Sequence, residues 1–215
     1  IEIHSHLKQV GTIQDAPINM VHPDMKALGN IATEPIAMLD AGKRGEVEKL
    51  VMQLKKDGDS TGGIVEVVAT GLPIGLGNPN FDGIENRSAR VIFGVPAIKG
   101  ISFGGGFDIC SRLGSEVNDA FTMNGDKITT TTNNSGGIQG GITNGLPLVM
   151  QVGIKPTPSI YKEQHSVSLS QKEDTLLTIK GRHDPCVALR AVPVIEAVTA
   201  LVILDFLGDI DHELR

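Results

Sequence analysis

The stretch GRHDPCVALRAVPVIEAVTALVILDFL, residues 181–207, decides the fold because it joins a charged segment to a long apolar run. The run from Val194 to Leu207 predicts a helix that begins near Ala191. Pro193 would then lie in the first turn, where the missing N–H costs nothing. Nearly every face of this helix is apolar, which predicts burial on nearly all sides. A membrane span is not expected, because the run is short and two carboxylates interrupt it.

The charged segment ahead of this helix holds Arg182, His183 and Asp184. Charged groups are rarely buried unless paired, so the segment is either a structural ion pair or a site for an anion. Alternate residues of an extended segment face the same way, which puts Arg182 and Asp184 on one face. Together they could bind an anion and move a proton. An aspartate beside an arginine tends to stay ionised, as a general base requires.

Two segments further upstream indicate the same kind of ligand. SGGIQGGITNG, residues 135–145, lacks the Gly-Lys-Ser/Thr ending of a P-loop and any G-x-G-x-x-G pattern. It is either a tight turn or a loop whose backbone amides approach a flat or anionic ligand. In KPTPS, residues 155–159, two prolines fix the backbone and leave Lys155, Thr157 and Ser159 projecting. One ammonium and two hydroxyls suit a phosphate, although an ordinary strand exit stays the alternative.

Hydrophobic periodicity predicts the remaining elements. Helices are expected over 41–56, ending at Gly58, and over 82–93. Strands are expected over 63–70, 101–103, 127–132 and 148–154, with a hairpin of 167–169 and 175–179. Strands and helices occur in blocks, which favours an α+β fold with an antiparallel sheet over a doubly wound parallel one.

Composition narrows the functional class. A chain of 215 residues fits one large domain better than two small ones. The net charge of -6 and the absence of Trp argue against a nucleic-acid partner. Cys110 and Cys186 have no C-x-x-C spacing and are expected as free thiols in a reducing cytoplasm. No signal peptide is recognised at the start. His4 and His6 form an H-x-H pair without a third ligand nearby, so a structural role is favoured over metal binding.

Five segments, taken together and in order, resemble the chorismate synthases. They are DGDSTGG at 57–63, GLGNPNFDGIENRSARVIFGVPAIKG at 75–100, SGGIQGGITNG at 135–145, KPTPSI at 155–160 and GRHDPCVALRAVPVIEA at 181–197. The resemblance implies a compact α+β fold in which antiparallel sheets sandwich helices, assembled as a homotetramer. Three motifs of that family's N-terminal part, a Gly-x-Ser-His-Gly-like one, Arg-Pro-Gly-His-Ala-Asp and Arg-Ser-Ser, are missing here. Residues 1–215 are therefore expected to be the C-terminal portion of a single domain.

The resemblance also implies a reaction and a site. Chorismate synthase eliminates phosphate from 5-enolpyruvylshikimate 3-phosphate and removes a proton from ring carbon 6. It requires reduced FMN, with NADP as an associated cofactor, although there is no net redox change. Asp184 would be the base, and Arg182 would neutralise the charge of the substrate phosphate or of the flavin. The positions that match flavin contacts of the family are Pro96, Ala97, Gly140, Lys155, Pro156, Thr157, Pro158, Ser159 and Arg182.

Two other functional classes stay open on the sequence. The first is a non-catalytic chain that only binds flavin or supports oligomerisation, which the missing motifs suggest. The second is a generic phosphate-binding protein, which would require that the family segments match by chance. Neither alternative predicts a membrane or nucleic-acid partner.

Overall fold

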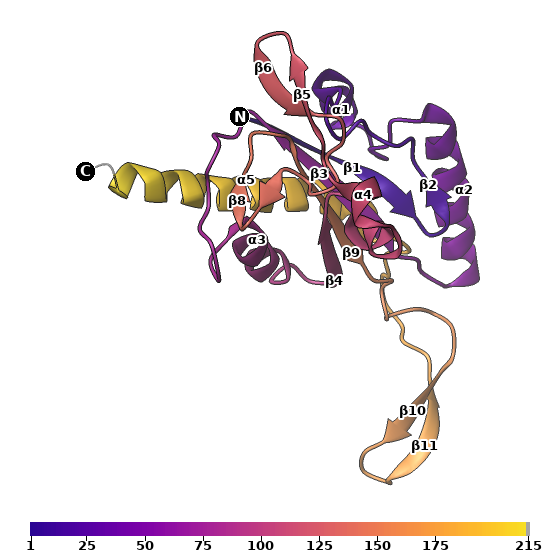
Figure 1. Ribbon diagram of the computed structural model, residues 1–215. Coiled ribbons are helices and arrows are strands. Elements are labelled where there is room, and N and C mark those ends of the chain that lie inside the picture. The colour runs from indigo at the N-terminus through magenta and orange to yellow at the C-terminus, as the bar shows by residue number, and fades with distance from the viewer. Residues whose placement is uncertain (214–215) are drawn as a thin grey trace.

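A five-stranded antiparallel sheet forms the centre of the molecule (Figure 1). The computed structural model describes residues 1–213, with side chains to residue 209. The strand order is β2-β1-β3-β9-β4, and every neighbouring pair is antiparallel. The strands are β1 (Glu2–Val10), β2 (Ile13–Gln14), β3 (Gly63–Thr70), β4 (Ile98–Phe103) and β9 (Leu148–Ile154).

Helices cover both faces of this sheet. They are α1 (Met25–Ile31), α2 (Ala41–Asp57), α3 (Ile84–Ile92), α4 (Gly114–Val117) and α5 (Ala188–Glu213), with a 3-10 turn η1 (Gly106–Ser111). On β3, Val67 belongs to the core cluster that contains Ile195 of α5, whereas the next residue, Val68, packs on Leu28 of α1. Successive strand residues point to opposite faces. Helices α5 and α1 therefore lie on opposite sides of the sheet.

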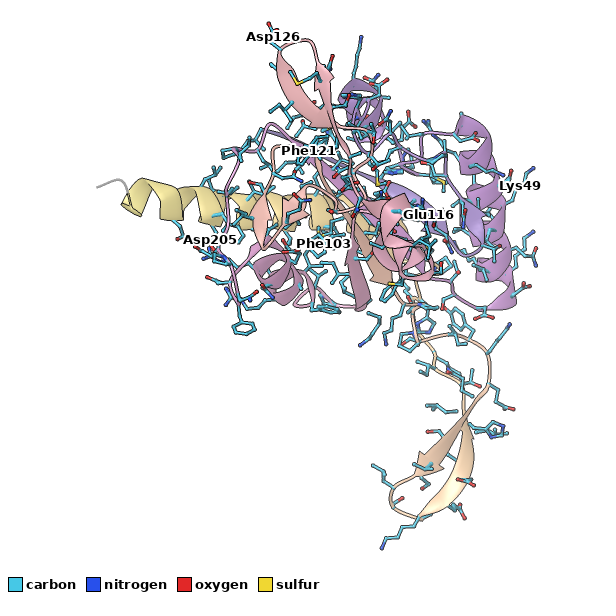
Figure 2. All side chains as sticks on the ribbon, viewed as in Figure 1. Lys49, Phe103, Glu116, Phe121, Asp126 and Asp205 are labelled. Carbon is cyan, nitrogen blue, oxygen red and sulfur yellow. The ribbon has the colours of Figure 1, made fainter. Side chains whose placement is uncertain are left out.

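Three two-stranded hairpins stand outside the central sheet. They are β5 (Phe121–Asn124) with β6 (Lys127–Thr130), β7 (Ile138–Gln139) with β8 (Ile142–Thr143), and β10 (Gln164–Ser168) with β11 (Glu173–Leu177). The β10–β11 hairpin projects far from the body of the molecule (Figure 1). The β5–β6 hairpin projects from another side, with Asp126 at its tip and Phe121 near its base (Figure 2).

Most predicted elements are present. The predicted strand 63–70 is β3, and the predicted helix 41–56 is α2, one residue longer. Gly58 caps α2 in the left-handed conformation at φ 67°, as a helix stop requires. The strand bounds of the long hairpin lie one to three residues before their predicted positions, and α1, α4, η1, β2, β5, β7 and β8 were not predicted. The mixed α+β class is confirmed, and the sheet is antiparallel.

Helix α5 differs from its prediction in two ways. It begins at Ala188, so Pro193 lies inside the helix rather than in its first turn. Its predicted burial on nearly all sides is wrong, because Val194, Leu201 and Leu204 are 44%, 61% and 64% exposed. These three side chains form an apolar stripe on the face turned away from the sheet. One further sheet layer, expected from the sandwich, does not occur among residues 1–213.

Helix α5 is also long and apolar enough, by length and composition alone, to cross a membrane. The helix is longer than the predicted apolar run, so length alone does not exclude a membrane span. Its inner face, however, is built into the core. Arg87 of α3 forms ion pairs with Asp205 and Asp209 of α5 at 3.0 and 2.7 Å, and its guanidinium lies 4.2 Å above the ring of Phe206. Such contacts are those of a helix packed in a folded protein.

Candidate functional site

Three of the predicted segments meet at the end of the sheet where β9 leaves and β4 enters. The N–H of Lys155, at the exit of β9, donates to the carbonyl oxygen of Ala97 at 3.0 Å. The N–H of Thr61 donates at 2.8 Å to the carbonyl oxygen of Pro185, in the segment before α5. Ser60, next to Thr61, donates to the carbonyl oxygen of Thr157 at 2.7 Å. The 96–97, 155–159 and 182–185 segments are thereby joined at one place, which we call the β9 exit site.

Two local features of the β9 exit site are unusual for a purely structural corner. Ala97 has a φ of 73°, a left-handed conformation that a residue with a Cβ seldom adopts. The Oγ1 atom of Thr157 is buried and has no hydrogen-bond partner within the described residues. Strained backbone and unpartnered polar atoms gather at functional sites, where a ligand can complete them. Both residues are among the predicted flavin contacts.

The positive charge of the β9 exit site is available to a ligand. Lys155 and Arg182 are exposed, and neither forms an ion pair with any side chain that the structure describes. Pro156 and Pro158, also exposed, hold the backbone on either side of Thr157, and the next predicted contact, Ser159, is half-buried. Pro96 is exposed beside Ala97. An ammonium, a guanidinium and a buried hydroxyl form a donor set that suits a phosphate group.

Asp184 is engaged differently from the prediction. Its Oδ2 accepts from Nε of Arg190 at 2.8 Å and is also paired with Nη2 of that residue. Its Oδ1 accepts from the N–H of Cys186 at 3.0 Å, just ahead of α5. The guanidinium that faces Asp184 is thus that of Arg190, not of Arg182. The carboxylate is held in a fixed orientation and stays about 20% exposed, so it can be reached from solvent or by a ligand.

Gly140 lies elsewhere. Gly140 and Gly141, with φ of 62° and 84°, form the two-residue turn of the β7–β8 hairpin, as positive φ at both positions allows. Gly141 accepts from the N–H of Ile84 at the start of α3. The hairpin precedes the first residue of β9, and the β9 exit site follows the last. The seven residues of β9 lie between them along the chain, and no hydrogen bond among the described residues joins the hairpin to the β9 exit site.

Cavities are distributed unevenly between these two places. The β9 exit site has a small cavity of about 20 Å³, lined among others by Gly58, Tyr161 and His183. A cavity of about 650 Å³ lies beside the glycine-rich hairpin, between Phe121 of β5, Ile128 of β6 and Asn144. The larger one has the volume of a cofactor site. The smaller cavity lies beside the charged groups that were predicted to bind phosphate. Within one chain, the large cavity and these charged groups are therefore at different ends of β9.

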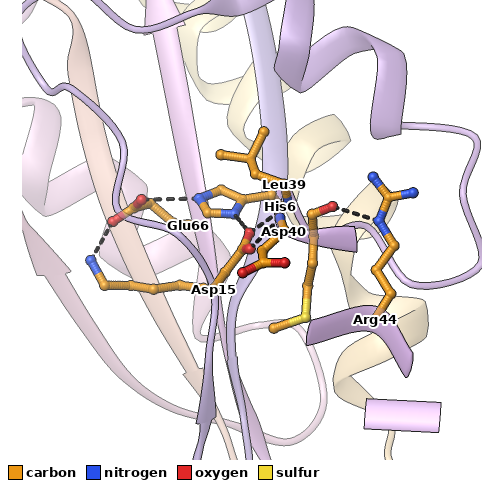
Figure 3. A network of polar contacts seen from close by, with 8 residues as sticks. His6, Asp15, Leu39, Asp40, Arg44 and Glu66 are labelled. Atoms are coloured by element: carbon orange, nitrogen blue, oxygen red, sulfur yellow. Dashed lines mark hydrogen bonds and ion pairs between the residues drawn. The ribbon is translucent and has the colours of Figure 1, made fainter. Parts of the chain in front are cut away.

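A buried charge network lies on the α1 side of the sheet (Figure 3). His6 Nδ1 is 2.9 Å from Oδ2 of Asp15, and Nε2 is 3.0 Å from Oε2 of Glu66. Lys8 Nζ lies 2.6 Å from the other oxygen of Glu66, and Asp15 also accepts from the N–H groups of Leu39 and Asp40. This arrangement agrees with the structural role predicted for His6.

The network sets the charge states of its members. Burial alone would lower the pKa of His6, but hydrogen bonds to Asp15 and Glu66 outweigh it and raise the pKa. Burial would likewise raise the pKa values of Asp15 and Glu66, yet their bonds to His6 and to further donors lower both. The two carboxylates therefore favour the imidazolium form of His6.

Comparison with known proteins identifies the family. The profile of chorismate synthase matches residues 1–207 of this chain. The chorismate synthase of Methanothermobacter thermautotrophicus is 39% identical over 207 residues, which cover 95% of this chain and 54% of that protein. This chain belongs to the chorismate synthase family. That of Dehalococcoides mccartyi is 44% identical over 184 residues, or 86% of this chain and 50% of that protein.

The fold supports the same family. A crystal structure of chorismate synthase matches with a TM-score of 0.76 at 27% identity, covering 96% of this chain and 56% of that one. The chain thus spans about half the length of the chorismate synthases it matches.

Three residues of the β9 exit site received no role from the sequence. Arg190 pairs with Asp184, Ser60 bonds to the 155–159 loop, and Tyr161 packs against His183 with ring centroids 4.6 Å apart. Ser60 lies in the DGDSTGG stretch that resembles the family, and this resemblance could have identified Ser60 as a residue of the site. Nothing local in the sequence marks Tyr161.

Proposed function

We propose that this chain contributes the flavin and phosphate contacts of a chorismate synthase, which eliminates phosphate from 5-enolpyruvylshikimate 3-phosphate. The proposal is supported mainly by one observation: Ala97, the 155–159 loop and the segment before α5 meet at the β9 exit site. The residues present fit the phosphate of FMN, because Thr157 offers a buried hydroxyl without a partner among the described residues and Lys155 and Arg182 are exposed cations. When bound, reduced FMN supplies the electron density that assists the elimination without net redox change.

Each side chain has a role in this proposal. Lys155 and Thr157 bind an anionic phosphate by charge and by hydrogen bonding. Arg182 stabilises the negative charge that develops as phosphate departs. Asp184, oriented by Arg190 and by the N–H of Cys186, accepts the proton from the substrate ring.

We further propose the context that the family implies. The relatives are about twice as long as this chain, so the full activity is proposed for this chain together with whatever supplies the other half of that length. The apolar stripe of α5 would be covered by the second sheet of the sandwich, since such a patch favours contact with another layer. A cytoplasmic homotetramer, without a membrane or nucleic-acid partner, completes the proposal.

A second candidate function is flavin binding without catalysis. The observation that favours it is the covered length, because the chain matches 54% of one relative and 50% of another. This candidate predicts FMN binding and no chorismate. It is separated from the first by an anaerobic assay with reduced FMN that follows both chorismate and released phosphate.

FMN titration, followed by quenching of flavin fluorescence, tests the proposal. Lys155→Ala should weaken FMN binding by roughly 10- to 150-fold, because a hydrogen bond to a charged group contributes about 1.5–3 kcal/mol. Lys49→Ala, an equal change of charge on the exposed face of α2, is the control and should bind FMN normally. An affinity of Lys155→Ala within twofold of the parent would remove the 155–159 loop from the phosphate site.

A further inference from the structure

The turn between α2 and β3, residues 58–62, is bonded to the 155–159 loop. Ser60 Oγ donates a hydrogen bond of 2.7 Å to the carbonyl oxygen of Thr157, a residue 97 positions away. The N–H of Tyr161, just beyond the loop, donates to the carbonyl oxygen of Gly58 at 3.0 Å. The loop is therefore held in its middle and at its end by one short turn.

The loop depends on outside bonds because of its own composition. Pro156 and Pro158 have no N–H to donate, so the loop has few backbone bonds of its own. The N–H of Lys155 is used by Ala97 at the loop's start. Between Lys155 and Tyr161, the contact from Ser60 is the one that reaches residue Thr157 itself.

Close packing brings the turn to this position. A Cβ at Gly62 would lie 2.2 Å from the carbonyl oxygen of Ile154, a distance that atoms do not reach. The turn can approach the loop because residue 62 is a glycine. The neighbouring N–H of Thr61 bonds to Pro185, so the same turn also holds the segment that carries Asp184.

We infer that Ser60 is a positioning residue for the flavin phosphate, an inference that rests on the function proposed above. By fixing the carbonyl of Thr157, Ser60 fixes the residue whose hydroxyl is buried without a partner. An unpartnered buried hydroxyl is unfavourable until a ligand supplies the missing bond. Ser60 thus keeps a phosphate-binding hydroxyl in place before the ligand arrives, without contacting the ligand itself.

The test compares two neighbouring hydroxyl deletions. Ser60→Ala removes the bond to the loop, whereas Thr61→Val removes a hydroxyl of the same turn that makes only a 3.5 Å contact with Gly62. Ser60→Thr retains the donor and serves as the rescue. Amide exchange of Lys155 and Tyr161 is measured without ligand, and FMN affinity is measured by flavin fluorescence.

Ser60→Ala is expected to speed exchange of both amides and to weaken FMN binding roughly fivefold, the effect of one lost hydrogen bond. Thr61→Val and Ser60→Thr should match the parent in both measurements. Exchange and affinity within twofold of the parent in Ser60→Ala would overturn the inference. A parent chain that binds no FMN overturns the proposed function, and the positioning role with it, even if the exchange rates change as expected.

Discussion

At the scale of single residues, the buried His6 has the most definite consequence for stability. The pKa of His6 is higher in the folded protein than the value of about 6.5 in the unfolded chain. The stability that His6 contributes is therefore complete below about pH 6.5 and is lost as the pH rises through its folded-state pKa. Asp15 and Glu66 have lowered pKa values in the folded protein. The stability that they contribute is therefore present above about pH 4 and is lost as the pH falls through their folded-state pKa values. The network is therefore most stabilising between about pH 4.5 and 6.5.

His6→Gln should flatten the fall in stability between pH 6 and pH 9, because the titrating imidazole is gone. The free energy of unfolding at pH 6 should also drop by about 3–5 kcal/mol, since the change leaves two buried carboxylates without their cation. Urea unfolding at a series of pH values measures both effects. His165→Gln, on the exposed β10 strand, is the control. If His6→Gln keeps the parent's slope, the network does not titrate as described.

A substitution at Asp184 can distinguish a role in proton transfer from a role in stability. Asp184→Asn keeps an oxygen for the N–H of Cys186 and loses the charge that faces the exposed Arg190. Exposed ion pairs contribute about 0–1 kcal/mol, so the unfolding midpoint should barely move.

Turnover of the Asn variant, measured in an assembly that forms chorismate, should fall by about 10²- to 10⁴-fold if Asp184 is the base. Arg190→Gln should change turnover far less, because it removes only the orienting partner. Full turnover in a stable Asn variant would exclude Asp184 from proton transfer.

At the scale of elements, α5 shows where sequence reasoning fails. Apolar residues on every face indicate burial, but the sequence does not tell which layer provides it. The structure provides a partner on one face alone, so Ile195 is fully buried and Leu201 is 61% exposed.

A pair of substitutions on α5 tests this asymmetry. Ile195→Ala should lower the free energy of unfolding by about 2–5 kcal/mol, because it creates a cavity against the sheet. Leu201→Ala should change it by less than about 0.5 kcal/mol, as exposed substitutions do. Chemical denaturation of the chain measures both. Equal losses would show that the outer face of α5 is covered in solution.

Local signals account for the elements that were predicted well. Strand β3 has a β-branched run bounded by glycines, and α2 has both helical periodicity and Gly58 as its stop. The short pairs β7 and β8 were missed because two residues carry no periodicity. For the site, the sequence named the segments that meet, but not that Arg190 would pair with Asp184. The Asp184–Arg190 ion pair depends on the backbone path from the 182–185 segment into α5, and no local sequence pattern predicts that path.

At the scale of the whole molecule, the position of Gly140 becomes informative. It lies in a turn that precedes β9, whereas Lys155 follows the last residue of β9, yet both match flavin contacts of the family. If both line a flavin, there are two arrangements to distinguish: one copy holds both residues at opposite ends of the same flavin, or two copies share each site. In the second arrangement, a two-fold symmetric pair has the hairpin of each copy at the β9 exit site of the other.

Mixing two defective variants tests the shared site. Lys155→Ala removes the ammonium, and Gly140→Asp places a repelling carboxylate in a turn conformation that Asp tolerates better than most residues. Each variant alone should bind FMN weakly. After subunit exchange in equal amounts, half of the pairs are mixed, and each mixed pair has one site with neither change.

About one quarter of all sites should then recover parental affinity, as statistical pairing of two copies requires. A flavin titration of the mixture, compared with the two variants kept separate, measures this fraction. A site built within one chain can never recover, because every chain in the mixture carries a defect. No recovery, with Gly140→Asp weak on its own, would place Gly140 and Lys155 around one flavin within the same copy. Normal binding by Gly140→Asp alone would instead remove the glycine hairpin from the flavin site.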